Sequence, residues 1–110
     1  MASAFKTATA ADVGTSLTTV YTCPSSTTST IIGLYLCNQS GGQIEATAQF
    51  YDAGETNHIS MVHGSPVPSG STLVVVGGDG KVVLEAGDKI KVQSNVASSI
   101  DVTLSYLEQT

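Results

Sequence analysis

Hydrophobic and polar residues alternate along most of the chain, and Gly, Pro, Ser or Asn interrupts the alternation about every ten residues. A period of two indicates β-strands, because successive side chains of a strand point to opposite faces of a sheet. No segment keeps the 3.6-residue period of an amphipathic helix. The pattern therefore predicts an all-β protein, an antiparallel β-sandwich of about 7–8 short strands, jelly-roll-like in its arrangement.

Two segments predict half-buried strands clearly. In residues 44–51 and 100–107, apolar side chains at every second position are expected to face the core and polar ones the solvent. The expected inward residues are Ile44, Ala46, Ala48, Phe50, Ile100, Val102, Leu104 and Tyr106.

The segment 30–38 has apolar residues on both faces, which predicts a central strand that is covered on both sides. Unbroken alternation would place one set on the core side and the other on the outer side, where a neighbouring subunit would cover it. The first set is Ile32, Leu34 and Leu36, and the second is Ile31, Gly33, Tyr35 and Cys37. Residues 73–76 show a similar excess. The candidate intersubunit contacts are therefore Ile31, Tyr35, Val74 and Val76.

The turn residues are spread evenly along the chain, which indicates one domain. Residues 1–14 are expected to form a flexible N-terminal arm or an edge strand, and residues 15–110 a single β-sandwich domain. The run Gly77-Gly78-Asp79-Gly80 predicts a hairpin connection between two short strands.

Composition narrows the possible partners. Only 12% of the 110 residues are charged, the net charge is −5, and there is no Arg. A basic stripe for nucleic acid cannot be built, and an anionic membrane surface is a poor partner. The first residues lack a signal-peptide pattern, so synthesis in the cytoplasm is expected, with Cys23 and Cys37 as free thiols. If 24–29 is a hairpin loop, the two cysteines lie too far apart to bridge; another connection would remove this argument.

Chemistry-bearing residues are few and scattered. The two histidines, His58 and His63, are five residues apart, so on a continuous strand they face opposite sides. Most acids fall in turns, and no serine lies in a nucleophile elbow. Asp79 with Glu85 or Asp88 could supply oxygen ligands for calcium, but this stretch matches no calcium-loop motif. We expect no enzyme activity, no catalytic residues, no metal ligands and no cofactor.

Two stretches carry a family resemblance. The first is Val20-Tyr-Thr-Cys-Pro24 through Thr30-Ile-Ile-Gly-Leu-Tyr-Leu-Cys-Asn38. The second begins at Pro66-Val-Pro-Ser-Gly70, continues through Lys81-Val-Val-Leu-Glu-Ala-Gly-Asp-Lys-Ile-Lys-Val92 and ends in Ile100–Glu108. Together they resemble small virion structural proteins of tailed bacteriophages, including those of cyanobacteria. The piece Leu84-Glu-Ala-Gly-Asp-Lys-Ile90 also resembles a turn of trimeric jelly-roll domains of the complement and tumour-necrosis type.

This resemblance implies a capsid decoration (cement) protein that is made in the host cytoplasm and assembled on the virion surface. Its expected partners are further copies of itself, as a homotrimer, and the major capsid or other virion proteins. Alternatives are a neck or tail accessory, a carbohydrate-binding receptor-recognition module, and a cupin-type metalloenzyme. Low aromatic content disfavours the carbohydrate-binding module, and two histidines are too few for the cupin.

Overall fold

The computed structural model describes residues 3–110, which form nine β-strands and no helix. No helix in this range could therefore cross a membrane. The strands are β1 (Ser3–Val13), β2 (Thr18–Thr22), β3 (Thr28–Asn38), β4 (Ile44–Asp52), β5 (Asn57–Val67), β6 (Thr72–Val76), β7 (Val82–Leu84), β8 (Lys89–Ser94) and β9 (Ile100–Gln109).

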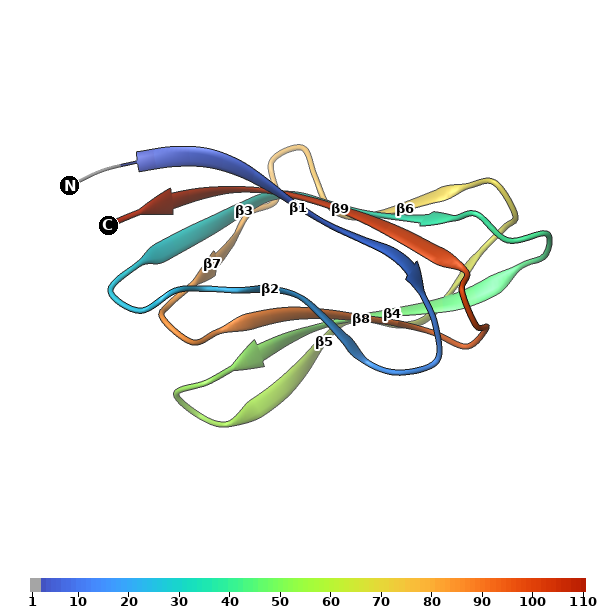
Figure 1. Cartoon of the computed structure of the whole chain (residues 1–110), viewed down its shortest axis with the longest axis horizontal. Helices are drawn as coiled ribbons and strands as arrows, with labels where there is room; N and C mark the ends of the chain where they lie inside the picture. Colours follow the sequence, from blue (N-terminus) through green and yellow to red (C-terminus); the bar gives the residue numbers. More distant parts are fainter. Residues whose placement is uncertain (1–2) are drawn as a thin grey trace.

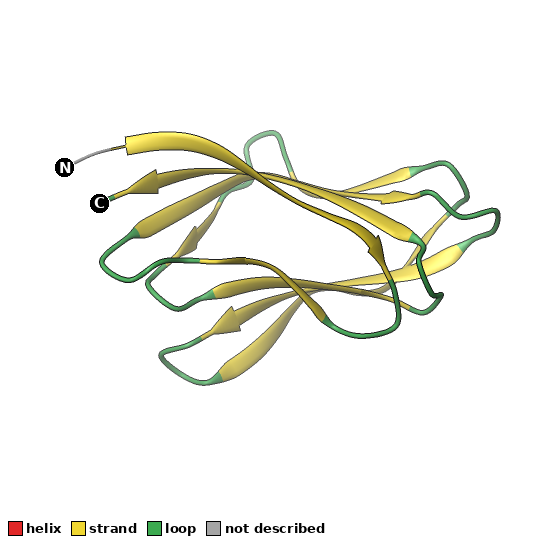
Figure 2. Ribbon diagram, in the orientation of Figure 1, coloured by secondary structure: helices red, strands yellow, loops and turns green. Residues whose placement is uncertain are grey.

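The strands form two antiparallel sheets that pack face to face (Figures 1 and 2). Sheet A has the order β1-β9-β3-β6, with β7 also paired to β3, and sheet B has the order β2-β8-β4-β5. The strands β1 to β4 alternate between the sheets, and the last two strands pair with the first two. This order is that of a jelly roll. The predicted all-β sandwich is confirmed, with one strand more than expected.

The core lies between the two sheets and follows the predicted alternation in β4 and β9. Ile44, Ala46 and Ala48 are buried, and Phe50 packs against them. All four expected inward residues of β9 are buried. Each large apolar side chain buried in this way contributes roughly 1.5–3 kcal/mol. The core is completed by residues of the other strands, among them Ile31, Leu34, Leu36, Leu84, Ile90 and Val92.

The expected faces of β3 are wrong over its first half, because the strand contains a β-bulge. The pairing of β3 with β9 shifts between Ile31 and Gly33. A bulge inserts one extra residue and reverses which side chains point inward. Ile31 therefore faces the core and is 0% exposed, while Ile32 is partly exposed. Beyond the bulge, Leu34 and Leu36 point inward and Tyr35 outward, as expected.

Two predicted connections are also wrong. The strands β6 and β7 do not pair with each other; both pair with β3, at residues 34–37 and 29–31. Gly77–Gly80 thus joins two parts of one interrupted edge and is not a hairpin turn. Likewise, residues 23–27 connect sheet B to sheet A and are not a hairpin loop. Cys23 and Cys37 are both free thiols, as expected. The argument that a hairpin at 24–29 keeps them apart does not apply, because that hairpin does not exist.

The N-terminal segment is an edge strand of sheet A. Residues Ser3–Val13 pair with β9 along nearly their whole length, from Ser3 opposite Gln109 to Val13 opposite Ile100. The two ends of the described chain consequently lie side by side (Figure 1). Of the expected arm, residues 1 and 2 lie outside the described residues.

Candidate functional site

The outer face of sheet A carries most of the exposed apolar side chains. We call this surface the apolar face and define it by its larger residues: Phe5, Ile32, Tyr35, Val74, Val83 and Leu107. Phe5 is 76% exposed, and Val83 and Val74 are 56% and 55% exposed. The register aligns them in rows across the sheet, since Phe5 pairs with Leu107, Leu107 with Thr30, and Thr30 with Val83.

A second row centres on Tyr35. Its neighbours across the sheet are Val74 of β6 and Thr103 of β9. The Tyr35 ring lies over Gly33, where an added Cβ would come within 2.9 Å of the ring atoms. Glycine leaves the room for this ring to lie flat along the strand, so the bulge and the glycine together shape the face.

The structure separates the four candidate intersubunit residues into two groups. Tyr35 and Val74 lie on the apolar face. Ile31 and Val76 are 0% and 4% exposed and belong to the core of the same chain, so they are not surface contacts. Ile31 points inward because of the bulge in β3. Val76 points inward because the register between β3 and β6 shifts at Tyr35 and Val74. Phe5 and Val83 were missed, because Phe5 lay in the expected arm and Val83 in a short strand.

The apolar face is almost free of charge. The charged residues Asp101 and the exposed Asp12 of β1 lie together at one end of the face, where Asp101 Oδ1 accepts a hydrogen bond from the backbone N–H of Asp12 at 3.0 Å. The chain carries a net charge of −5. Copies of such a chain repel one another, and an uncharged face is where this repulsion and the cost of desolvation are lowest.

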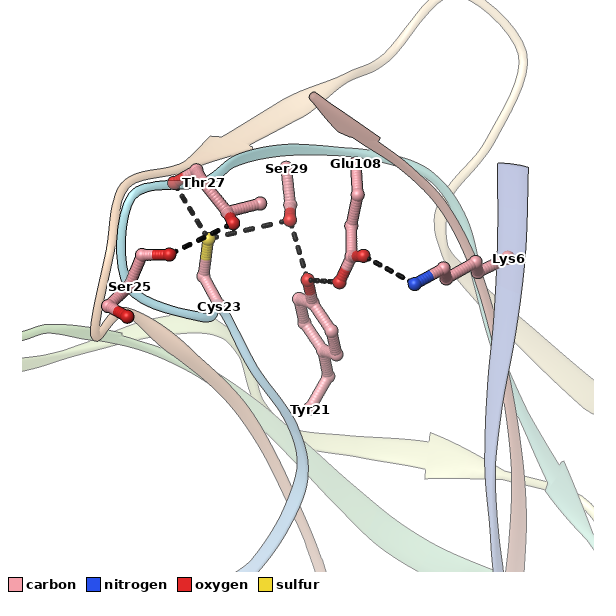
Figure 3. A network of polar contacts seen from close by, with 7 residues as sticks. All are labelled: Lys6, Tyr21, Cys23, Ser25, Thr27, Ser29 and Glu108. Carbon is pink, nitrogen blue, oxygen red and sulfur yellow. Dashed lines mark hydrogen bonds and ion pairs between the residues drawn. The ribbon is translucent and has the colours of Figure 1, made fainter. Parts of the chain in front are cut away.

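A polar network ties the two sheets together at the end of the sandwich where the termini lie (Figure 3). The Tyr21 hydroxyl of β2 contacts Ser29 Oγ of β3 at 2.6 Å and donates to Glu108 Oε2 of β9 at 2.7 Å. The other Glu108 oxygen accepts from Lys6 Nζ of β1 at 2.7 Å. The Tyr21 ring also packs on Tyr106, with ring centroids 4.2 Å apart.

The charges in this network fix the direction of its hydrogen bonds. The hydrogen bond from Lys6, followed by that from Tyr21, lowers the pKa of Glu108 below its ordinary value. Burial raises the pKa of Tyr21, so this hydroxyl stays protonated and donates to the carboxylate. Ser29 then donates to the Tyr21 oxygen. The arrangement links β1, β2, β3 and β9 and rigidifies this end of the molecule.

The network also contains the Cys23 thiol. Its Sγ lies 3.3 Å from Thr27 O and 3.4 Å from Ser29 Oγ. Cys23 is 1% exposed, and no histidine joins the network (Figure 3). A nucleophilic cysteine needs access and a base or positive neighbour, so these contacts support a packing role.

The two histidines lie on the same outer face of sheet B, and the expectation of opposite faces is wrong. His58 pairs with Tyr51, and their rings lie 4.8 Å apart. His63 lines a hollow with Glu45, Thr47 and Gln93. A bulge in β5 between Ser60 and Val62 reverses the alternation between the two histidines. In the part of the chain that the structure describes, no three His, Cys, Asp or Glu residues gather to hold a metal ion.

Comparison with known proteins yields a similarity of fold. No protein-family model matches the chain, and no curated protein matches it in sequence. A solved structure of a Bacillus endospore appendage protein that forms disulfide-linked pili is similar, with a TM-score of 0.54 and 15% sequence identity. The similarity covers 98% of this chain and 88% of the pilus chain.

Proposed function

We propose that this protein is a structural subunit that assembles through its apolar face, and that its place is the virion of a tailed bacteriophage as a capsid decoration protein. The observation that carries the proposal is the exposure of the Phe5, Val74 and Val83 side chains in two neighbouring rows on the outer face of sheet A. Exposed apolar surface of this extent is typical of protein–protein contact sites. The role is that of a binding surface and not of a catalyst.

The shape of the molecule suits this role. Its outline of 45 × 26 × 22 Å leaves room on one broad face for the roughly 800 Å² that each partner buries in a standard interface. The network of Tyr21 and Glu108 stiffens the sheet that presents the face. The similar fold of the pilus protein is compatible with such a subunit, since that protein forms pili.

The expected occupants of the face are further copies of the chain, arranged as a trimer, with virion proteins as the final partner. Light scattering of the purified protein over a dilution series should give a mass of three chains that persists at low micromolar concentration. The variant Val74→Asp places a charge on the face and should give single chains. Ile59→Asp is a matched control, because Ile59 is similarly exposed, at 52%, but lies in β5.

A monomeric wild-type protein at every concentration would contradict assembly through this face. So would loss of the trimer in Ile59→Asp with its retention in Val74→Asp. The virion placement has its own test, sedimentation of the protein with undecorated capsids of the phage that encodes it. Failure to sediment with intact capsids would reject decoration and leave self-assembly standing.

A further inference from the structure

The outer face of sheet B gathers positive charge in a protein that is otherwise acidic. Lys89 and Lys91 of β8, Tyr51 of β4 and His58 of β5 lie together on this face, and we call these four residues the basic patch. The register places Lys89 and His58 on either side of Tyr51. The ammonium groups of Lys89 and Lys91 lie 5.7 and 5.1 Å from the centre of the Tyr51 ring.

The basic patch has no internal counterion. Within residues 3–110, the ion pair of the structure is Lys6 with Glu108, far from the patch on the other sheet. Lys91 Nζ instead lies 3.3 Å from His58 Nε2. An ammonium group can only donate, so this contact is a hydrogen bond in the tautomer of His58 that has no proton on Nε2. Half of the lysines of the chain thus lie side by side without an acid, and this arrangement favours an anionic ligand.

Hydrogen-bonding groups extend from the basic patch along the same face. The next positions of β4 and β8 carry Gln49, Thr47 and Gln93, and a hollow of about 220 Å³ lies between Glu45, Thr47, His63 and Gln93. The Gln49 Oε1 atom is buried and has no hydrogen-bond partner in the described residues, so a ligand could use this acceptor only after the Gln49 side chain turns outward. Same-face residues of a strand are about 7 Å apart, so patch and hollow suit an extended ligand.

We propose that this face binds an acidic oligosaccharide, with the acid group of one sugar at Lys89 and Lys91 and a neighbouring sugar unit in the hollow. The two lysines of the basic patch would bind the acid group, and the amide, hydroxyl, imidazole and Glu45 carboxylate groups of the hollow would bind sugar hydroxyls, which both donate and accept. A nucleic acid would need several more cations than this face carries. Two lysines are also too few to hold the protein on an anionic lipid surface. The apolar face lies on the opposite side of the sandwich, so both faces can be occupied at once.

The test is titration of the protein with trigalacturonic acid, followed by NMR chemical shifts, with neutral maltotriose and inorganic sulfate as comparison ligands. We expect saturable shifts with the acidic trisaccharide, at least tenfold weaker binding of maltotriose, and sulfate binding that is weaker still. The double variant Lys89→Gln/Lys91→Gln should lose tenfold or more in affinity. Lys81→Gln is the matched control, because Lys81 is exposed in a loop where its Nζ donates to Gly78 O.

Three outcomes would overturn the proposal. They are equal binding of acidic and neutral trisaccharides, binding of sulfate as strong as that of the trisaccharide, and undiminished binding by the double lysine variant. A survey of carboxylated and sulfated glycans on an array without any hit would be a fourth outcome that rejects it. Because the lysine variants leave the apolar face intact, their mass by light scattering is a separate result and bears only on assembly.

Discussion

At the scale of single residues, Tyr21 is the link on which the joining of the sheets depends most. Its buried hydroxyl forms hydrogen bonds with both Ser29 and Glu108. We predict that Tyr21→Phe lowers the free energy of unfolding by about 1–3 kcal/mol, because it leaves a buried hydroxyl and a carboxylate oxygen without their partner. Urea denaturation followed by circular dichroism measures this loss. Tyr35→Phe, a change of the same size on the outer face, should cost less than 0.5 kcal/mol, as is usual at the surface.

The lowered pKa of Glu108 gives the stability of the protein a definite dependence on pH. A carboxyl group whose pKa is lower in the folded state stabilises that state above its unfolded value, here 4.5, and loses this contribution as the pH falls through the folded pKa. We predict that Glu108→Gln is less stable than wild type at pH 7 and that this difference narrows below pH 4.5. Thermal unfolding between pH 7 and pH 3 measures it. A difference that stays constant over this range, or an equal narrowing in the exposed-turn variant Glu55→Gln, would assign the effect to something other than the network.

At the scale of the strand, β3 shows how far the sequence determines the fold. Alternation identified the inward residues of β4 and β9 because every second side chain of these two strands points to the core along the whole predicted segment. It failed at Ile31, His63 and Val76, each of which lies next to a register shift on its own strand or its partner. A bulge depends on how two strands fit together, and one strand's sequence does not contain that information. Gly33 was the available signal, since glycine within a strand often marks a bulge.

The core position of Ile31 gives a test of this corrected register. We predict that Ile31→Ala costs about 2–5 kcal/mol of unfolding free energy, the usual loss when a fully buried Ile is truncated. Val83→Ala, on the neighbouring strand β7 where the exposed Val83 lies opposite Thr30, should cost under 0.5 kcal/mol. Urea denaturation measures both losses of unfolding free energy. Equally small losses in the two variants would mean that Ile31 faces outward, as the alternation without a bulge predicts.

The packing of Tyr35 on Gly33 is a second property of this strand. We predict that Gly33→Ala displaces the Tyr35 ring, because the new Cβ would lie 2.9 Å from ring atoms, and that it costs at most about 1 kcal/mol, since the exposed ring can move aside. In a Tyr35→Ala background the same change should cost little, since the obstacle is gone. The double-mutant cycle, measured as unfolding free energies, gives the coupling directly. Additive effects would show that the ring does not rest on the glycine.

At the scale of the whole molecule, the two outer faces differ in a way that separates their tasks. The apolar face presents Phe5, Val74 and Val83, whereas the outer face of sheet B presents lysines, amides and the Glu45 carboxylate. The strand order of the jelly roll places these faces back to back, with the core between them. The sequence predicted an outward apolar surface, but the basic patch joins the hairpin of β4 and β5 to β8, which follows only after two further strands. No local pattern could have indicated it.

The reactivity of Cys37 can show whether the apolar face is covered, because its partly exposed thiol lies beside that face while Cys23 is buried. If copies assemble through that face, the Cys37 thiol is covered in the assembly and open in the single chain. We predict that its rate constant for reaction with Ellman's reagent falls several-fold as the protein concentration rises through the range in which the mass increases. The Val74→Asp variant should react at one rate at all concentrations. A wild-type rate that stays constant while the mass rises would locate the contact between copies elsewhere, and the free edge of β1, eleven residues long, would then be the next surface to examine.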